Sequence, residues 1–190
     1  IDVDLPDMVY GVIERPPRYG GRVGSFNGDE VRAMAGVIDV FETDRGVAVV
    51  ADKYWRARKA QDALSVDWDF SEALSLSTKD VFESYRTAAD EDVGESERSK
   101  GSFERAVDGA ERVLEAEYSQ PYLAHATLEP MNATAWYRGD RMEVWAPTQA
   151  PDLGRIAVAR ATDLGPDDVT IHTTFLGGGF GRRLTQDYIE

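Results

Sequence analysis

The sequence predicts an α+β protein whose strands and helices fall into two groups along the chain. Short β-rich runs, such as residues 47–51 (VAVVA), alternate with segments of helical apolar spacing, such as residues 151–164. A polar, charged stretch without periodicity, residues 89–101 (ADEDVGESERSKG), separates the two groups and has the composition of a solvated connector. The expected boundaries are 1–88 for the first domain, 89–102 for the connector and 103–190 for the second domain.

The composition excludes several classes of protein. The chain has 35 acidic against 21 basic residues and a net charge of −14, which disfavours nucleic acid and anionic membranes as partners. It has no cysteine, so it cannot itself hold a disulfide, a zinc–thiolate site or an iron–sulfur cluster. His125 and His172 are its only histidines, too few for most metal-centred enzymes, and no apolar run reaches the ~18 residues of a membrane span.

The first domain should combine strands and short helices in a mixed sheet. Its first strand should end before Pro16, because proline cannot donate to a β-ladder. Gly20, Gly21 and Gly24 favour a loop next. The run VAVVA is apolar throughout, which indicates burial on both faces. Strands are expected at 8–13, 37–41, 47–51 and 65–70, and helices at 29–35 and 52–64.

A helix should follow that domain, because Ser77 and Asp80 have the spacing of a capping box. In the second domain, Gly139-Asp140 predicts a tight hairpin, and Pro151 suits the first position of a helix. Residues 103–110 should form a short helix, 151–164 a longer one, and 114–118, 133–138, 141–146 and 169–175 strands.

The last of these strands leads into the most glycine-rich segment, residues 176–183 (LGGGFGRR). Consecutive glycines expose backbone N–H groups, so such a loop can approach a phosphate, an oxo group or a pterin closely. Arg182 and Arg183 would add anion-pairing capacity. The alternative is a tight turn between strand and helix. The dinucleotide and P-loop glycine patterns both fail, because Arg182 stands where the third glycine is needed and no lysine follows.

Two further motifs precede this loop. Residues 122–132 (YLAHATLEPMN) contain His125 and Glu129, which could form an acid–base pair if the segment were helical. Pro121 and Pro130 argue against a long helix, and a structural histidine is the alternative. Residues 145–151 (WAPTQAP) form a rigid polar turn, in which Gln149 offers both donors and acceptors. Alone, this turn would be an ordinary loop.

Taken together and in this order, HATLEPMNATA, WAPTQAP and LGGGFGRR resemble the molybdenum-cofactor subunit of the xanthine oxidase/aldehyde oxidase family, especially its isoquinoline 1-oxidoreductase beta-subunit branch, also known as membrane-associated aldehyde dehydrogenase. The first domain resembles the family's a/b hammerhead domain through ERPPRYGGRVGSFN and the segment AGVIDVFETDRGVAVVADKYWRARKAQDAL. The resemblance covers nearly the whole chain. It implies a hammerhead domain followed by the first part of a molybdopterin-binding domain, within a longer protein.

The resemblance also implies an activity and a site. Such enzymes hydroxylate an aldehyde or an electron-poor heteroaromatic carbon with oxygen from water, and they pass electrons to a small subunit with 2Fe-2S clusters. The molybdenum cofactor, in its cytosine dinucleotide form, would lie against the backbone amides of Gly178, Gly179, Phe180 and Gly181, with the Phe180 amide facing an oxo ligand. Gln149 would hold the pterin side. No side chain here would ligate the metal, and Gly179→Val should abolish activity, because valine disfavours positive φ and would occupy ligand space.

Departures from the family pattern limit the substrate. The xanthine-oxidising branch has Gln and Glu where this chain has Leu123 and Leu184, so an aldehyde or N-heteroaromatic substrate is favoured over a purine. The family's general base lies beyond this chain, and Glu129 is not assigned to that role. The isolated chain is therefore expected to lack cofactor and activity and to need the rest of its protein. Relatives suggest a periplasmic or inner-membrane location, with the cytoplasm as alternative.

Two other functions remain open from the sequence. The chain could be a non-catalytic scaffold for subunit contact, which would not need the glycine loop. A nucleotide-binding α/β domain is disfavoured by the failed glycine spacings.

Overall fold

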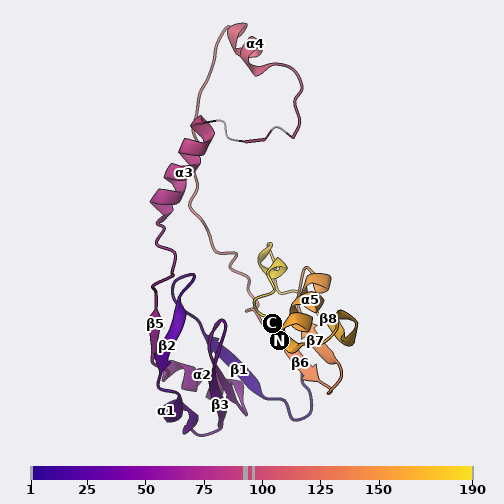
Figure 1. The fold of residues 1–190 in the computed structure, drawn as a ribbon. Helices are drawn as coiled ribbons and strands as arrows, with labels where there is room; N and C mark the ends of the chain where they lie inside the picture. The colour runs from indigo at the N-terminus through magenta and orange to yellow at the C-terminus, as the bar shows by residue number, and fades with distance from the viewer. Residues whose placement is uncertain (1, 92–93, 96, 190) are drawn as a thin grey trace. The chain divides into compact units, whose positions relative to one another are not determined.

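The computed structural model describes residues 2–91, 94–95 and 97–189, and it divides the chain into two units. One comprises Asp7–Pro121, and the other comprises Tyr122–Glu190 with Ile1–Pro6 (Figure 1). The break in this division lies after Pro121, whereas the connector was predicted at 89–102, of which residues 92, 93 and 96 lie outside the described residues. The domain boundaries predicted from composition stay a prediction.

The Asp7–Pro121 unit contains two antiparallel sheets, one of three strands in the order β1-β4-β3 and one that pairs β2 with β5. The strand bounds are β1 Tyr10–Glu14, β2 Arg22–Phe26, β3 Val37–Thr43, β4 Gly46–Ala51 and β5 Val66–Asp69. The central strand β4 is buried along most of its length, which confirms the prediction for VAVVA. Val31 of α1 (Gly28–Arg32) and Ala60 of α2 (Tyr54–Asp62) complete the core on this sheet.

Two predictions for this unit are wrong. Residues 22–26 form strand β2, although Gly20, Gly21 and Gly24 predicted a loop. The ladder with β5 tolerates Gly24 through a register shift between Val23 and Ser25, the kind of irregularity that glycine marks in a strand. The expected mixed sheet is instead antiparallel in both described sheets: β3 returns as β4 through a short turn, whereas β1 pairs with β4 and β2 with β5 across longer connections.

Helix α3 (Thr78–Asp90) begins as predicted. The Ser77 side chain accepts a hydrogen bond from the Asp80 N–H, and the Asp80 carboxylate accepts one from the Ser77 N–H, which completes the capping box. A short helix, α4 (Phe103–Asp108), follows as expected. The strand predicted at 114–118 is absent: these residues are exposed and have no regular structure. Their alternation is real, but no described strand pairs with them.

In the unit that contains residues 122–190, strands β6 (Thr134–Tyr137), β7 (Met142–Ala146) and β8 (Val169–Thr173) form one mixed sheet. β6 and β7 are the predicted hairpin, with Gly139 at φ +90° in its turn. β7 and β8 run parallel, joined by α5 (Pro151–Thr162) and the 3-10 helix η1 (Pro166–Asp168). Pro151 starts α5, as predicted.

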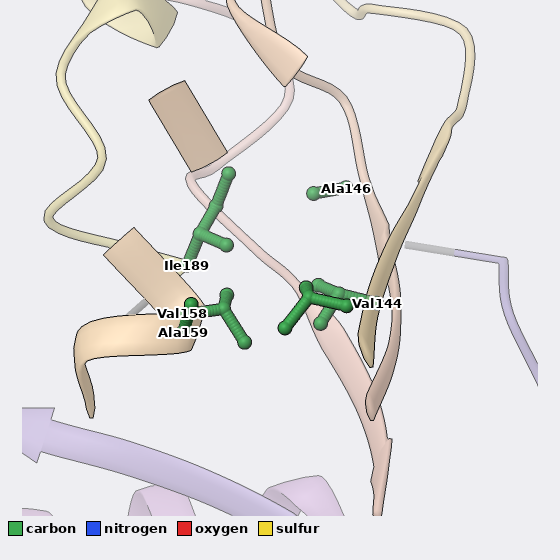
Figure 2. Packing of buried hydrophobic residues seen from close by; sticks show 6 residues of the cluster. Val144, Ala146, Val158, Ala159 and Ile189 are labelled. Carbon is green, nitrogen blue, oxygen red and sulfur yellow. The ribbon is translucent and has the colours of Figure 1, made fainter. Parts of the chain in front are cut away.

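Helix α5 packs on one face of this sheet. Figure 2 shows Val144 and Ala146 of β7 opposite Val158 and Ala159 of α5, with Ile189 beside them. All five side chains are buried, and Val169 of β8 belongs to the same cluster. The core therefore holds β7 and β8 against α5, and residues 147–150 and the glycine loop (residues 177–181) follow the carboxyl ends of these two strands.

Candidate functional site

The glycine loop lies between β8 and the 3-10 helix η2 (Arg182–Leu184) and has an unusual backbone. Gly178 and Gly181 have φ of +97° and +90°, and Phe180, a residue with a bulky side chain, has φ of +53°. A left-handed conformation at an aromatic residue is rare and costs of the order of 1 kcal/mol or more. The Phe180 side chain is 74% exposed, so burial of its ring does not compensate for this strain.

Three consecutive backbone amides of this loop have no acceptor in the part of the chain that the structure describes. Among the described residues, the N–H groups of Gly178, Gly179 and Phe180 donate no hydrogen bond. Their neighbours are bonded: the Gly177 N–H donates to Glu129 Oε2 at 3.0 Å, and the Gly181 N–H donates to Gln149 Oε1 at 3.1 Å. A fixed run of free donors without a Cβ at two of its positions suits an anionic or oxygen-rich ligand.

Gln149 belongs to the turn before α5, and its side chain reaches the glycine loop. If Gly179 carried a Cβ, that atom would lie 2.6 Å from Gln149 Oε1. Gly179 is not among the glycines with positive φ, so the backbone reason first expected for its importance is wrong. A Cβ at this position would instead meet the end of the Gln149 side chain, which would have to move. The predicted site residues Gly178, Gly179, Phe180, Gly181 and Gln149 do lie together, although Gly181 and Gln149 bond to each other.

Arg183 is the most connected residue of this region and is completely buried. Its Nε donates to the Gly178 carbonyl at 2.8 Å, and its Nη1 donates to the Pro147 carbonyl at 3.1 Å. Its Nη2 donates to both the carbonyl and Oε2 of Glu129, at 3.0 and 2.8 Å. The Arg183 carbonyl in turn accepts the Gln149 N–H at 3.2 Å. One guanidinium therefore contacts all three motifs.

Glu129 is the charge partner of this guanidinium. Burial by itself would raise the pKa of Glu129, but the hydrogen bonds from the Gly177 N–H and Asn132, together with the charge of Arg183, outweigh it and lower that pKa below its ordinary value. Glu129 and Gly177 also bond through their backbones, since the Glu129 N–H donates to the Gly177 carbonyl at 3.0 Å. Glu129 is thus an ionised anchor of the loop.

The structure excludes two uses of the motif side chains that the sequence left open. Residues 122–132 contain no helix, and Ala126 has φ of +48°, so His125 and Glu129 are not paired at helical spacing. Arg182 and Arg183 are not available for anions, because both are paired internally: Arg182 makes two bonds to Asp187, at 2.8 and 2.9 Å. The connecting role of Arg183 was missed, since no local pattern links it to Glu129, 54 positions earlier.

The described part of the chain holds no group of three or more His, Asp or Glu side chains that could bind a metal ion. None of its helices is long and apolar enough to cross a membrane.

The fold resembles part of several solved oxidoreductase structures. Quinoline 2-oxidoreductase from Pseudomonas putida 86 superimposes with a TM-score of 0.70 over 99% of this chain and 29% of its own, at 17% identity. Aldehyde oxidoreductase from Desulfovibrio gigas gives a TM-score of 0.69 over 95% of this chain and 25% of its own, at 18% identity. Residues 86–190, more than half of the chain, match the model of the molybdopterin cofactor-binding domain, and the chain belongs to that family. The predicted fold class, α+β with part of a molybdopterin-binding domain, is confirmed.

Relatives in sequence agree with this family. A membrane-bound aldehyde dehydrogenase from Gluconacetobacter polyoxogenes, whose name specifies pyrroloquinoline quinone, is 31% identical over all of this chain. Isoquinoline 1-oxidoreductase subunit beta from Brevundimonas diminuta is 25% identical over 97% of it. The predicted resemblance is confirmed. The chain spans only 26% and 25% of these two relatives' lengths.

Proposed function

We propose that this chain is part of a molybdenum hydroxylase that oxidises an aldehyde or an N-heteroaromatic compound, and that its glycine loop binds the molybdenum cofactor. The observation that carries the proposal is the run of three free amides at Gly178, Gly179 and Phe180, in a chain of the molybdopterin-binding family. When bound, the cofactor supplies the metal that oxidises the substrate, with water as the source of oxygen.

The residues present fit such a group. The loop offers backbone donors and no acidic side chain of its own, so an oxyanion or oxo group meets N–H dipoles without repulsion. The Phe180 N–H would donate to an oxygen on the metal, and the amides of Gly178 and Gly179 would donate to the same anionic group. Gln149 Oε1 accepts a hydrogen bond from the Gly181 N–H in the structure, so a ligand on this loop would compete with Gln149 for that donor. The Gln149 side-chain amide would then face the pterin as a donor.

The chain's own residues also bear on the substrate. Leu123 and Leu184, both exposed, stand where the xanthine-oxidising branch has polar side chains. Apolar groups there leave the polar edge of a purine without partners, which favours an aldehyde or a less polar heteroaromatic compound. The electron acceptor would be a small subunit with 2Fe-2S clusters, and the lack of cysteine in this chain fits clusters that are held elsewhere.

The test uses the complete reading frame that contains this chain, co-expressed with its neighbouring genes. The purified protein should contain molybdenum, release a pterin with a cytosine nucleotide, and reduce a dye when given aldehyde. Oxygen from labelled water should appear in the product. Protein with no molybdenum and no pterin would refute the proposal, as would activity restored by pyrroloquinoline quinone alone.

A non-catalytic scaffold is the second candidate. A scaffold has no use for strained residues with free amides, so the loop argues against it. Protein that assembles with a cysteine-rich subunit but never contains cofactor would favour the scaffold.

A further inference from the structure

We propose that Arg183 and Glu129 are positioning residues that hold the glycine loop in its ligand-binding conformation. The inference rests on the proposed function, because it concerns how the loop is made ready for the cofactor. Neither side chain would touch the cofactor: Arg183 is fully buried, and the Glu129 carboxylate is directed to Arg183, Gly177 and Asn132.

The first step of the argument is the identity of the groups that the guanidinium binds. Three of its four hydrogen bonds go to backbone carbonyls, those of Gly178, Pro147 and Glu129. Carbonyl contacts fix where the main chain runs, whereas an ordinary ion pair fixes only side chains. Arg183 therefore holds the backbone of the glycine loop, the turn before α5 and residue 129 against one another. Its planar fork of five donors suits this arrangement, and lysine has no such fork.

The second step concerns the conformation of the loop itself. The Gly178 N–H has no hydrogen-bond acceptor among the described residues. The Gly178 carbonyl, in contrast, accepts a hydrogen bond from Arg183 Nε at 2.8 Å. Anchoring the carbonyl at φ +97° fixes the plane of the peptide that leads to Gly179, and hence the direction of the Gly179 N–H. On the other side, Glu129 holds Gly177 by two bonds, through its carboxylate and its backbone N–H. The free amides are thus aligned by residues outside the loop.

The third step separates Arg183 from its neighbour. Arg182 makes an ion pair of similar geometry, but among the described residues its side chain bonds only to Asp187, five positions away. Both arginines lie in η2, and both pair with a carboxylate that is mostly buried. Arg182→Met therefore removes a comparable ion pair without releasing the loop, and it serves as a matched control.

The experiment compares four variants of the complete protein: Arg183→Met, Arg183→Lys, Arg182→Met and the double variant Arg183→Met with Glu129→Gln. Hydrogen exchange of peptides covering residues 176–181 is measured in the cofactor-free protein, well below the thermal midpoint. Molybdenum per polypeptide is measured in protein purified from cells. The first readout does not depend on cofactor or activity.

Arg183→Met should speed exchange of the two hydrogen-bonded amides of the loop, those of Gly177 and Gly181, by about tenfold or more. It should also lower the molybdenum content by roughly tenfold to a hundredfold, the usual cost of losing a group that orients metal-binding groups. Arg183→Lys should fall between Arg183→Met and wild type, and Arg182→Met should match wild type in both readouts. The double variant should regain thermal stability over Arg183→Met, because it also removes the largely buried negative charge that Arg183 balances, yet its loop should still exchange fast.

The possible results are distinguishable. Slow loop exchange and full molybdenum in Arg183→Met would overturn this inference and leave the proposed function standing. Recovery of both loop exchange and molybdenum in the double variant would also overturn it, since charge balance alone would then explain Arg183. Wild-type protein without molybdenum would overturn the proposed function, and the role in cofactor binding with it.

Discussion

Replacing Gly179 by valine tests the cofactor loop most directly. A Cβ at this position would lie 2.6 Å from Oε1 and 3.0 Å from Cδ of Gln149. Both atoms belong to the end of a flexible, exposed side chain, so the fold can adapt by swinging Gln149 away. The Gly181 N–H then loses its 3.1 Å bond to Gln149, and the branched side chain lies beside the free amides.

The expected cost in stability is small. One exposed hydrogen bond contributes about 0.5–1.5 kcal/mol. Replacing a glycine that does not need positive φ returns about 0.4–1 kcal/mol, because the unfolded chain has fewer conformations. The net loss in the free energy of unfolding is therefore between roughly −0.5 and +1 kcal/mol. The cofactor, in contrast, should be lost almost completely, since the added methyl groups occupy the space that a ligand needs to reach the backbone.

Gly139→Val is the matched control. Gly139 has φ of +90° in the β6–β7 turn, and a Cβ there would meet nothing within 4 Å. A Cβ at this conformation costs about 1–2 kcal/mol, so the control should be destabilised at least as much as Gly179→Val.

Thermal midpoint and molybdenum per polypeptide are measured on both variants of the complete protein. Gly139→Val should keep its molybdenum, and Gly179→Val should lose it. Equal molybdenum contents in the two variants would show that the loop is only a structural turn.

Three other predictions concern pH, the isolated chain and its accessibility. Because the pKa of Glu129 is lowered in the folded state, its contribution to stability is complete above its ordinary pKa of 4.5 and is lost as the pH falls through the lower folded value. Glu129→Gln should thus flatten the loss of stability in urea titrations at decreasing pH, and an unchanged pH profile would contradict this. The 190-residue chain, purified alone, should contain no stoichiometric molybdenum by elemental analysis and show no aldehyde-dependent dye reduction. Limited proteolysis should cut first within residues 89–101, and early cuts within 37–64 would contradict that prediction.

Local patterns in the sequence were sufficient for the elements whose cause is local. The capping box at Ser77, the hairpin turn at Gly139 and the start of α5 at Pro151 each depend on neighbouring residues and φ preferences, and the structure has all three. The apolar run of β4 likewise predicted its own burial, because hydrophobic residues without alternation need cover on both faces. The glycine loop could likewise be predicted from the sequence, because its four glycines lie within five consecutive positions.

Tertiary structure decided what depends on distant partners. Residues 22–26 form strand β2 because β5, some forty positions later, pairs with them through backbone hydrogen bonds. This pairing stabilises the strand even though Gly24 by itself disfavours one. Residues 114–118 have an equally good strand pattern but no such partner among the described strands, and they stay extended and exposed. Arg183 and Glu129 are ordinary charged residues in the sequence. Only folding places them 2.8 Å apart in a buried site, where each satisfies the other's charge and both hold the loop. A strand or an ion pair is a property of two segments, so a pattern in one of them cannot determine it.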